Sequence, residues 1–152
     1  MASLLTSFSS QSKLFIVISA DNRIKLIDTD TKKAKRAYIE KDHLSHNYTC
    51  LNWYQKSVDV LGLLAVGCSD GKVVIWDLVR GVVVQTIING VNSITSVTFN
   101  NNGSYLFISD TLNYINQYQL GEDAVINTIK SGKRGVQRIA MNPRVDVLAV
   151  AR

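Results

Sequence analysis

The chain has 152 residues, which is enough for one domain of ordinary size. Apolar residues make up 46% and charged residues 19%, which is typical of a folded domain and excludes intrinsic disorder. The net charge of +5 permits an acidic partner without requiring one, and no stretch approaches the roughly 20 apolar residues of a transmembrane helix. We therefore expect no membrane partner. Two cysteines provide no disulfide framework, so we expect reduced thiols inside the cell.

The first unit of the chain contains three short apolar runs. An alternating segment ends at Phe8, and the runs Leu14–Ile18 and 24–27 follow, with a turn at 20–22 between them. Short runs that are rich in Ile and Val and bounded by turn residues predict β-strands. The next segment, 32–46, is the most loop-like of the chain, and we predict that it connects the first unit to the second.

The second unit has the clearest strand pattern. An alternating segment ends at Trp53, and the apolar runs 63–66 and 73–76 can pair across a turn that contains Asp70 and Gly71. An Asp-Gly pair supplies positive φ at little cost, which a tight turn between right-twisted strands requires. The pattern therefore predicts a β-hairpin with Gly71 in the left-handed region.

The later units repeat this pattern, and the fourth unit lacks its last two runs. The second unit ends with the run Val82–Ile88, the third has Phe99 followed by 105–108, 114–118 and 124–129, and the fourth has Met141 followed by 147–151. The closing residues Phe8, Trp53, Phe99 and Met141 lie 45, 46 and 42 residues apart. Four short strands that recur at this period predict the blades of a β-propeller.

The third run of the second unit ends with Trp76-Asp77, the dipeptide that names WD repeats, and the chain resembles that family. We therefore predict an all-β fold, a partial WD-repeat β-propeller of about three and a half four-stranded antiparallel blades. The repeats are expected at 4–39, 46–88, 91–130 and 134–152 of one incomplete domain that covers 1–152. Closed propellers normally need four to eight blades, so we expect a fragment of a longer protein. The alternative is that a partner or self-association supplies the missing blades.

Several residues are assigned to the structure of the blades. In WD repeats, His, Ser, Asp and Trp form an internal hydrogen-bond network, and the resemblance implies a reduced version with Cys68 in place of Ser. The assigned residues are His43, Trp53, Cys68, Asp70, Gly71, Trp76 and Asp77. Four residues of this region are also potential zinc ligands, namely His43, His46, Cys50 and Cys68. The spacing of the two histidines is unusual for zinc, so we favour the structural interpretation and expect no metal.

No motif of the chain indicates catalysis. The segment 131–135 only partly imitates a phosphate-binding loop, because Asn127 and Arg134 stand where that motif needs Gly and Ser or Thr. The nucleophile elbow and the His-Glu-x-x-His zinc motif are absent from the sequence. We expect no catalytic residues, no cofactor and no small-molecule substrate, and predict that the chain is not an enzyme.

Two basic clusters are candidate RNA contacts, because lysine and arginine neutralise backbone phosphates without reading sequence. Their members are Lys32, Lys33, Lys35 and Arg36 in the first cluster, and Lys133, Arg134 and Arg138 in the second. The alternative, which we favour, is that they form the solvated outer strand and loop rim of a propeller.

One stretch resembles a particular WD-repeat family. Four segments are similar to the first blade junction of a nucleolar family, the U-three snoRNA-associated protein five type. They are Arg36-Ala37-Tyr38-Ile39, the triplet at 43–45, the segment 48–53 and Leu63-Leu64-Ala65-Val66-Gly67. The resemblance covers the amino-terminal blades of such proteins and implies a subunit of the small-subunit processome. It implies a nuclear, nucleolar scaffold that binds other WD-repeat subunits and ribosomal RNA precursor. The alternative is a generic WD-repeat adaptor, such as a ubiquitin-ligase substrate receptor or a coat subunit.

Overall fold

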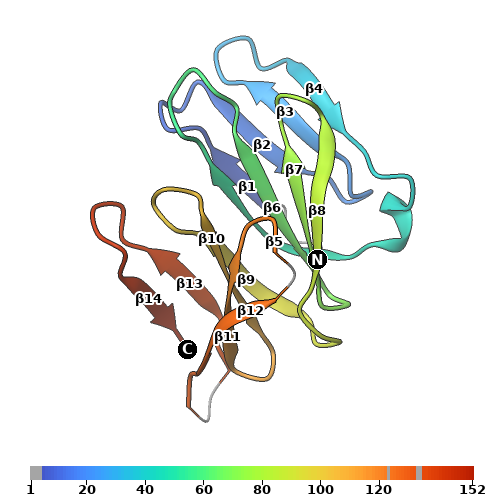
Figure 1. Ribbon diagram of the computed structural model, residues 1–152. Helices are drawn as coiled ribbons and strands as arrows, with labels where there is room; N and C mark the ends of the chain where they lie inside the picture. Colours follow the sequence, from blue (N-terminus) through green and yellow to red (C-terminus); the bar gives the residue numbers. More distant parts are fainter. Residues whose placement is uncertain (1–4, 123, 133–134) are drawn as a thin grey trace.

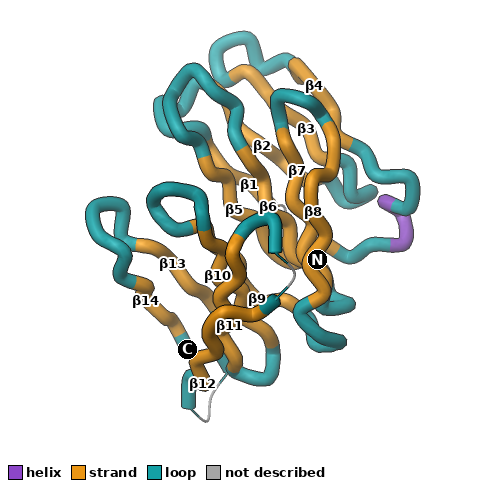
Figure 2. The backbone as a smooth tube through the Cα atoms, in the orientation of Figure 1, coloured by secondary structure: helices purple, strands orange, loops and turns teal. Residues whose placement is uncertain are grey.

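The computed structural model describes residues 5–122, 124–132 and 135–152, which form short strands and one 3-10 turn at His43–Ser45 (Figures 1 and 2). The strands are β1 Leu5–Phe8, β2 Leu14–Ile18, β3 Ile24–Asp28, β4 Ala34–Tyr38, β5 Tyr48–Tyr54, β6 Leu63–Cys68, β7 Lys72–Asp77, β8 Val82–Ile88, β9 Ile94–Phe99, β10 Tyr105–Asp110, β11 Tyr114–Gln119, β12 Val125–Lys130, β13 Arg138–Met141 and β14 Leu148–Ala151.

Consecutive strands pair with one another in antiparallel sheets. The strand orders are β1-β2-β3-β4, β5-β6-β7-β8, β9-β10-β11-β12 and β13-β14. The first strands of successive sheets are neighbours, since β1 contacts β5, β5 contacts β9 and β9 contacts β13. The sheets are therefore arranged as blades around a common inner edge, from blue to red in Figure 1. This arrangement confirms the predicted all-β fold, a partial propeller with three complete blades and two strands of a fourth in the described residues.

The segment between the first two blades corrects one prediction. Residues 34–38, which we expected within a connecting loop, form β4 and pair with β3. Only Tyr38 of this strand is buried, and the rest is exposed. Charged residues commonly protect the outer strand of a sheet against pairing with other chains. Because β4 has this polar edge character, it lacks the apolar run that identifies the other strands.

The hairpin of β6 and β7 has the predicted turn. Gly71 has φ of 88°, and its amide N–H donates to the Cys68 carbonyl at 3.3 Å. The Asp70 carboxylate accepts the Lys72 amide N–H at 3.2 Å. Positive φ at a glycine costs little, so the Asp-Gly sequence specifies this turn locally.

Both faces of the second blade are buried, each against a neighbouring blade. Leu64, Val66 and Trp76 pack into a core shared with the first blade, whereas Ala65 and Ile75 pack into a core shared with the third. Successive side chains of a strand point to opposite faces. Burial of both faces explains why 63–66 and 73–76 are continuously apolar rather than alternating.

Candidate interaction surfaces

The hydrogen bonds predicted among His43, Asp70 and Trp76 do not form among the described residues. His43 lies in the 3-10 turn, where its Nδ1 contacts the Glu40 carbonyl oxygen at 2.8 Å. Trp76 Nε1 is buried without a hydrogen-bond partner among the described residues. Asp70 instead pairs with Lys72, with Nζ and Oδ2 3.2 Å apart. The network prediction was wrong because the 3-10 turn directs the His43 ring back to its own segment.

Trp76 acts through packing instead. Its side chain is 4% exposed and meets the Tyr38 ring edge-on, with the ring centroids 5.7 Å apart. The Tyr38 hydroxyl donates to the Leu78 carbonyl at 2.7 Å, so the first blade is bonded to the second at the same place. Aromatic pairs in this geometry add to the stability that burial provides.

The other residues assigned to blade structure lie inside or beside the second blade. Trp53 packs against the core that the first and second blades share, and its indole N–H donates to the Leu61 carbonyl. Asp77 Oδ1 accepts the amide N–H groups of Val79 and Arg80, each at 3.0 Å, and thereby closes the turn after β7. Cys68 is buried in the same core as Trp76.

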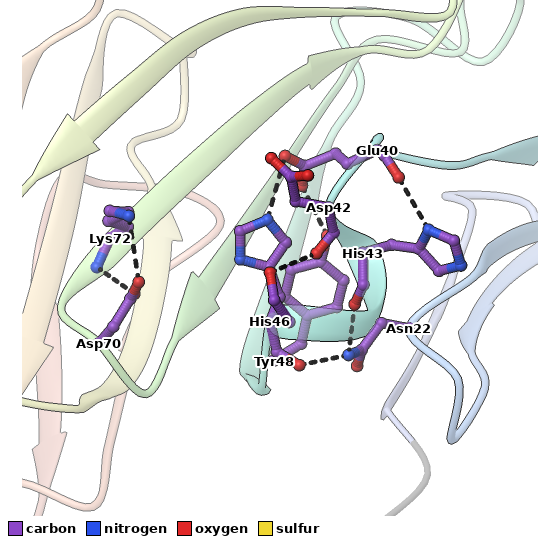
Figure 3. Close-up of polar contacts among 9 residues, drawn as sticks. Asn22, Glu40, Asp42, His43, His46, Tyr48, Asp70 and Lys72 are labelled. Carbon is purple, nitrogen blue, oxygen red and sulfur yellow. Dashed lines mark hydrogen bonds and ion pairs between the residues drawn. The ribbon is translucent and has the colours of Figure 1, made fainter.

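A polar cluster that the sequence analysis did not identify fixes the connection between the first two blades (Figure 3). Glu40 accepts a hydrogen bond from the Tyr48 hydroxyl at 2.6 Å and lies 3.5 Å from His46 Nε2. The His46 and Tyr48 rings are stacked, with centroids 5.7 Å apart. Asn22 Nδ2 donates to the carbonyls of His43 and His46. Burial and then Glu40 raise the pKa of Tyr48, so its hydroxyl remains a donor.

Two side chains of the first basic cluster, those of Lys35 and Arg36, already have partners within the protein. Lys35 Nζ lies 3.2 Å from Asp28 Oδ2, and the Lys32 amide N–H closes a turn on the Asp28 carbonyl at 2.8 Å. The Arg36 guanidinium lies over the Tyr38 ring and donates to the Val79 carbonyl at 2.7 Å. Arg36 therefore joins two blades, and its contact with RNA stays a prediction.

Gln85 makes an equivalent contact between the second and third blades. It donates through Nε2 to the Glu122 carbonyl at 2.9 Å and accepts the Gly121 amide N–H at 2.9 Å. Gln85 is opposite Ile75 in the strand register, as Arg36 is opposite Leu26, and an irregularity follows each pair. We call these two contacts the rim clasps. Polar residues on exposed strands give no sequence signal for them.

Breaking the first rim clasp should have a modest effect. We expect Arg36→Ala to lower the free energy of unfolding by about 1 kcal/mol, because its hydrogen bonds to backbone carbonyls are partly solvated. Arg80→Ala is the matched control, since Arg80 is also exposed and only its backbone forms a hydrogen bond among the described residues. The midpoints of urea denaturation measure the effects of both substitutions on stability. Equal effects of the two substitutions would contradict the clasp.

The second basic cluster is described only at Arg138, because Lys133 and Arg134 lie outside the described residues. Arg138 is the first residue of β13, is exposed, and lines a cavity of about 400 Å³. The inner strands of all four sheets contribute to this cavity. Residues far apart in the sequence thus meet around this arginine.

Both thiols are protonated at neutral pH. Burial raises the pKa of Cys50 to about 11 and that of Cys68 to about 12. Across the described ranges, no three His, Cys, Asp or Glu side chains gather in a group that could hold a metal ion. In the same residues, no helix is long and apolar enough to cross a membrane.

The thiols should react slowly while the protein is folded. At pH 8 we expect alkylation of Cys50 by iodoacetamide to be about a hundredfold slower than in the unfolded chain, because the thiolate fraction falls tenfold per pKa unit. Since the unfolded thiols lose their protons first, stability should fall as the pH rises from about 9 toward 11. Peptide mapping measures the rates, and equal rates in folded and unfolded protein would contradict the assignment.

Comparison with known proteins agrees with this geometry. Residues 40–77 match the family described as WD domain, G-beta repeat, and this segment includes β5, β6 and β7. No match was found among curated proteins. Because WD domains are generally non-enzymatic and mediate contacts between proteins, the WD repeat and the blades around it support a non-catalytic protein-interaction scaffold.

Proposed function

We propose that this protein is a non-catalytic scaffold of ribosome biogenesis, within the small-subunit processome. It would support processing of ribosomal RNA precursor and transcription of ribosomal RNA, in the nucleus and nucleolus. The observation that carries this proposal is the segment 36–53, which resembles the blade junction of a nucleolar WD-repeat family. This segment joins β4 to β5 and holds the polar cluster of Glu40, His46 and Tyr48.

Scaffold subunits of this type contact other WD-repeat subunits and RNA. Exposed Lys32 and Lys33 in the turn between β3 and β4 support a phosphate contact. Lys35 and Arg36 contribute less to this contact because Asp28 and the neighbouring blade engage them. The RNA contact is therefore proposed at the turn rather than along the whole basic cluster.

The cellular role is tested by localisation and depletion. We expect the protein in the nucleolus, co-purifying with ribosomal RNA precursor, and its depletion should lower small-subunit ribosomal RNA more than large-subunit RNA. Purely cytoplasmic protein, or normal small-subunit RNA after depletion, would reject the proposal. Such a result would favour the generic WD-repeat adaptor, for which the match at 40–77 is the supporting observation.

The RNA contact has its own test. The double variant Lys32→Gln and Lys33→Gln should weaken binding to single-stranded precursor RNA and reduce the salt slope, by about 1.4 for two phosphates lost. The control double variant, Lys41→Gln and Lys56→Gln, removes the same charge from exposed positions elsewhere. Filter binding at several salt concentrations measures both slopes. Identical slopes for the two double variants would reject a specific contact at this turn.

A further inference from the structure

The cavity beside Arg138 lies where the inner strands of the four sheets converge. It has a volume of about 400 Å³ and is lined by polar side chains from β1, β5 and β9, including Thr6, Asn52 and Thr95. Arg138 is the only charged residue among those that line it in the described part of the chain. The cavity is thus a polar site with a single positive charge.

Several groups that line the cavity can donate hydrogen bonds to a ligand. Asn52 accepts the Phe99 amide N–H through Oδ1 at 3.0 Å, which fixes the orientation of its side-chain amide. Its NH₂ group can only donate, and the hydrogen bond of this side chain within the described residues is made by Oδ1. The hydroxyl of Thr6 makes no hydrogen bond within the described chain, and the guanidinium of Arg138 adds further donors. Because the Asn52 NH₂ group and the positively charged guanidinium of Arg138 only donate, they favour an acceptor-rich, anionic ligand.

No carboxylate of the described residues forms an ion pair with Arg138. Its charge nevertheless reaches the cavity wall, because it is one of the influences that oppose the rise that burial causes in the pKa of Cys50. A single guanidinium binds a carboxylate through two parallel hydrogen bonds. Nucleic-acid backbones, in contrast, are bound by several cations that track successive phosphates.

We propose that this cavity is a docking site for one acidic side chain, an Asp or Glu presented by a segment of a partner protein. Arg138 binds its carboxylate, while Asn52 and Thr6 donate further hydrogen bonds to the same segment. This site goes beyond the proposed role in ribosome biogenesis and does not depend on it. It also assigns Arg138 to protein recognition rather than to RNA.

The experiment uses a capped hexapeptide, Gly-Ser-Glu-Gly-Ser-Gly, its Glu-to-Gln counterpart and a single-stranded RNA hexanucleotide as probes. Nuclear magnetic resonance titrations follow the backbone amides of Thr49, Thr95 and Ser96, which line the cavity. We expect the Glu peptide to shift these amides and to bind at least about tenfold more tightly than the Gln peptide, since a charge-assisted pair is lost.

Variants of the protein complete the test. Arg138→Gln should abolish the preference for the Glu peptide, and Arg138→Lys should retain part of it. Arg144→Gln, which removes an exposed arginine from the turn between β13 and β14, should leave it unchanged. Equal binding of the two peptides, or no shift of the cavity amides, would overturn the proposal. Tighter, Arg138-dependent binding of the RNA would overturn it in favour of a phosphate site.

Discussion

Trp76→Ala should lower the free energy of unfolding by about 3–5 kcal/mol, because it removes a large buried ring and leaves a cavity. The ring lies between the first and second blades and contacts Tyr38. Its loss therefore weakens the packing between blades as well as the second blade itself. Chemical denaturation, followed by circular dichroism, measures the change.

Trp76→Phe separates packing from hydrogen bonding. Trp76 Nε1 has no partner among the described residues, so phenylalanine loses volume without losing a hydrogen bond. We expect a cost of about 1–2 kcal/mol for this variant. If Trp76→Ala left the denaturation midpoint unchanged, the ring would not be part of the core. If phenylalanine cost as much as alanine, a hydrogen bond of the indole would have to be responsible.

The second large effect is expected at Gly71, where the backbone conformation and the available space both require glycine. A Cβ atom at this position would lie 2.3 Å from the Gly90 carbonyl oxygen, in addition to the strain of φ at 88°. Since the obstruction is backbone, no side chain can rotate away to relieve it. We expect Gly71→Ala to cost about 3 kcal/mol or more, and Gly71→Val to cost more still.

Gly121 provides a matched control for this substitution. It has the same φ of 88°, but a Cβ atom there would meet nothing within 4 Å. Gly121→Ala should therefore report the backbone strain alone, about 1–2 kcal/mol. Urea denaturation of both variants gives the difference, which measures the close approach of the turn between β6 and β7 to the segment that follows β8. Equal losses at the two positions would show that this approach is unimportant.

The roles of Trp76 and Gly71 agree with a scaffold whose function depends on a fixed arrangement of blades. Trp76 packs in the core that the first and second blades share, and Gly71 lets the turn between β6 and β7 approach the segment that leads from β8 to the third blade. The cavity at Arg138 depends on the same arrangement, because strands of all four sheets line it. Substitutions that weaken the packing between blades should therefore lower the affinity of the proposed site for the peptide, although the substituted residues do not line the cavity.

Apart from β4, the strand positions and the hairpin turn were predictable from the sequence because local patterns specify them. Burial of both faces made 63–66 and 73–76 continuously apolar, and the Asp-Gly pair specified the turn at Gly71. The predicted inner strands end where expected, at or one residue beyond Trp53, Phe99 and Met141. These features depend on interactions between residues that are close in sequence or on repetition of one pattern.

Only the tertiary structure decided which polar residues meet. The sequence pattern predicted His43 as a member of the hydrogen-bond network inside the blade. In the structure it is His46 that lies beside Glu40 and Tyr48. Polar side chains follow no periodic pattern, and their partners depend on how a connecting segment turns between blades.

The same reason applies to the rim and the cavity. Arg36 was identified from the sequence as a basic residue. Its hydrogen bonds to the carbonyls of Leu78 and Val79, which lie 42 and 43 positions further along the chain, depend on how the first two blades pack. Arg138 was likewise identified by its charge, and four strands from distant parts of the chain create the cavity beside it. Composition thus indicated which residues carry charge, and the packing of blades decided what each charge can contact.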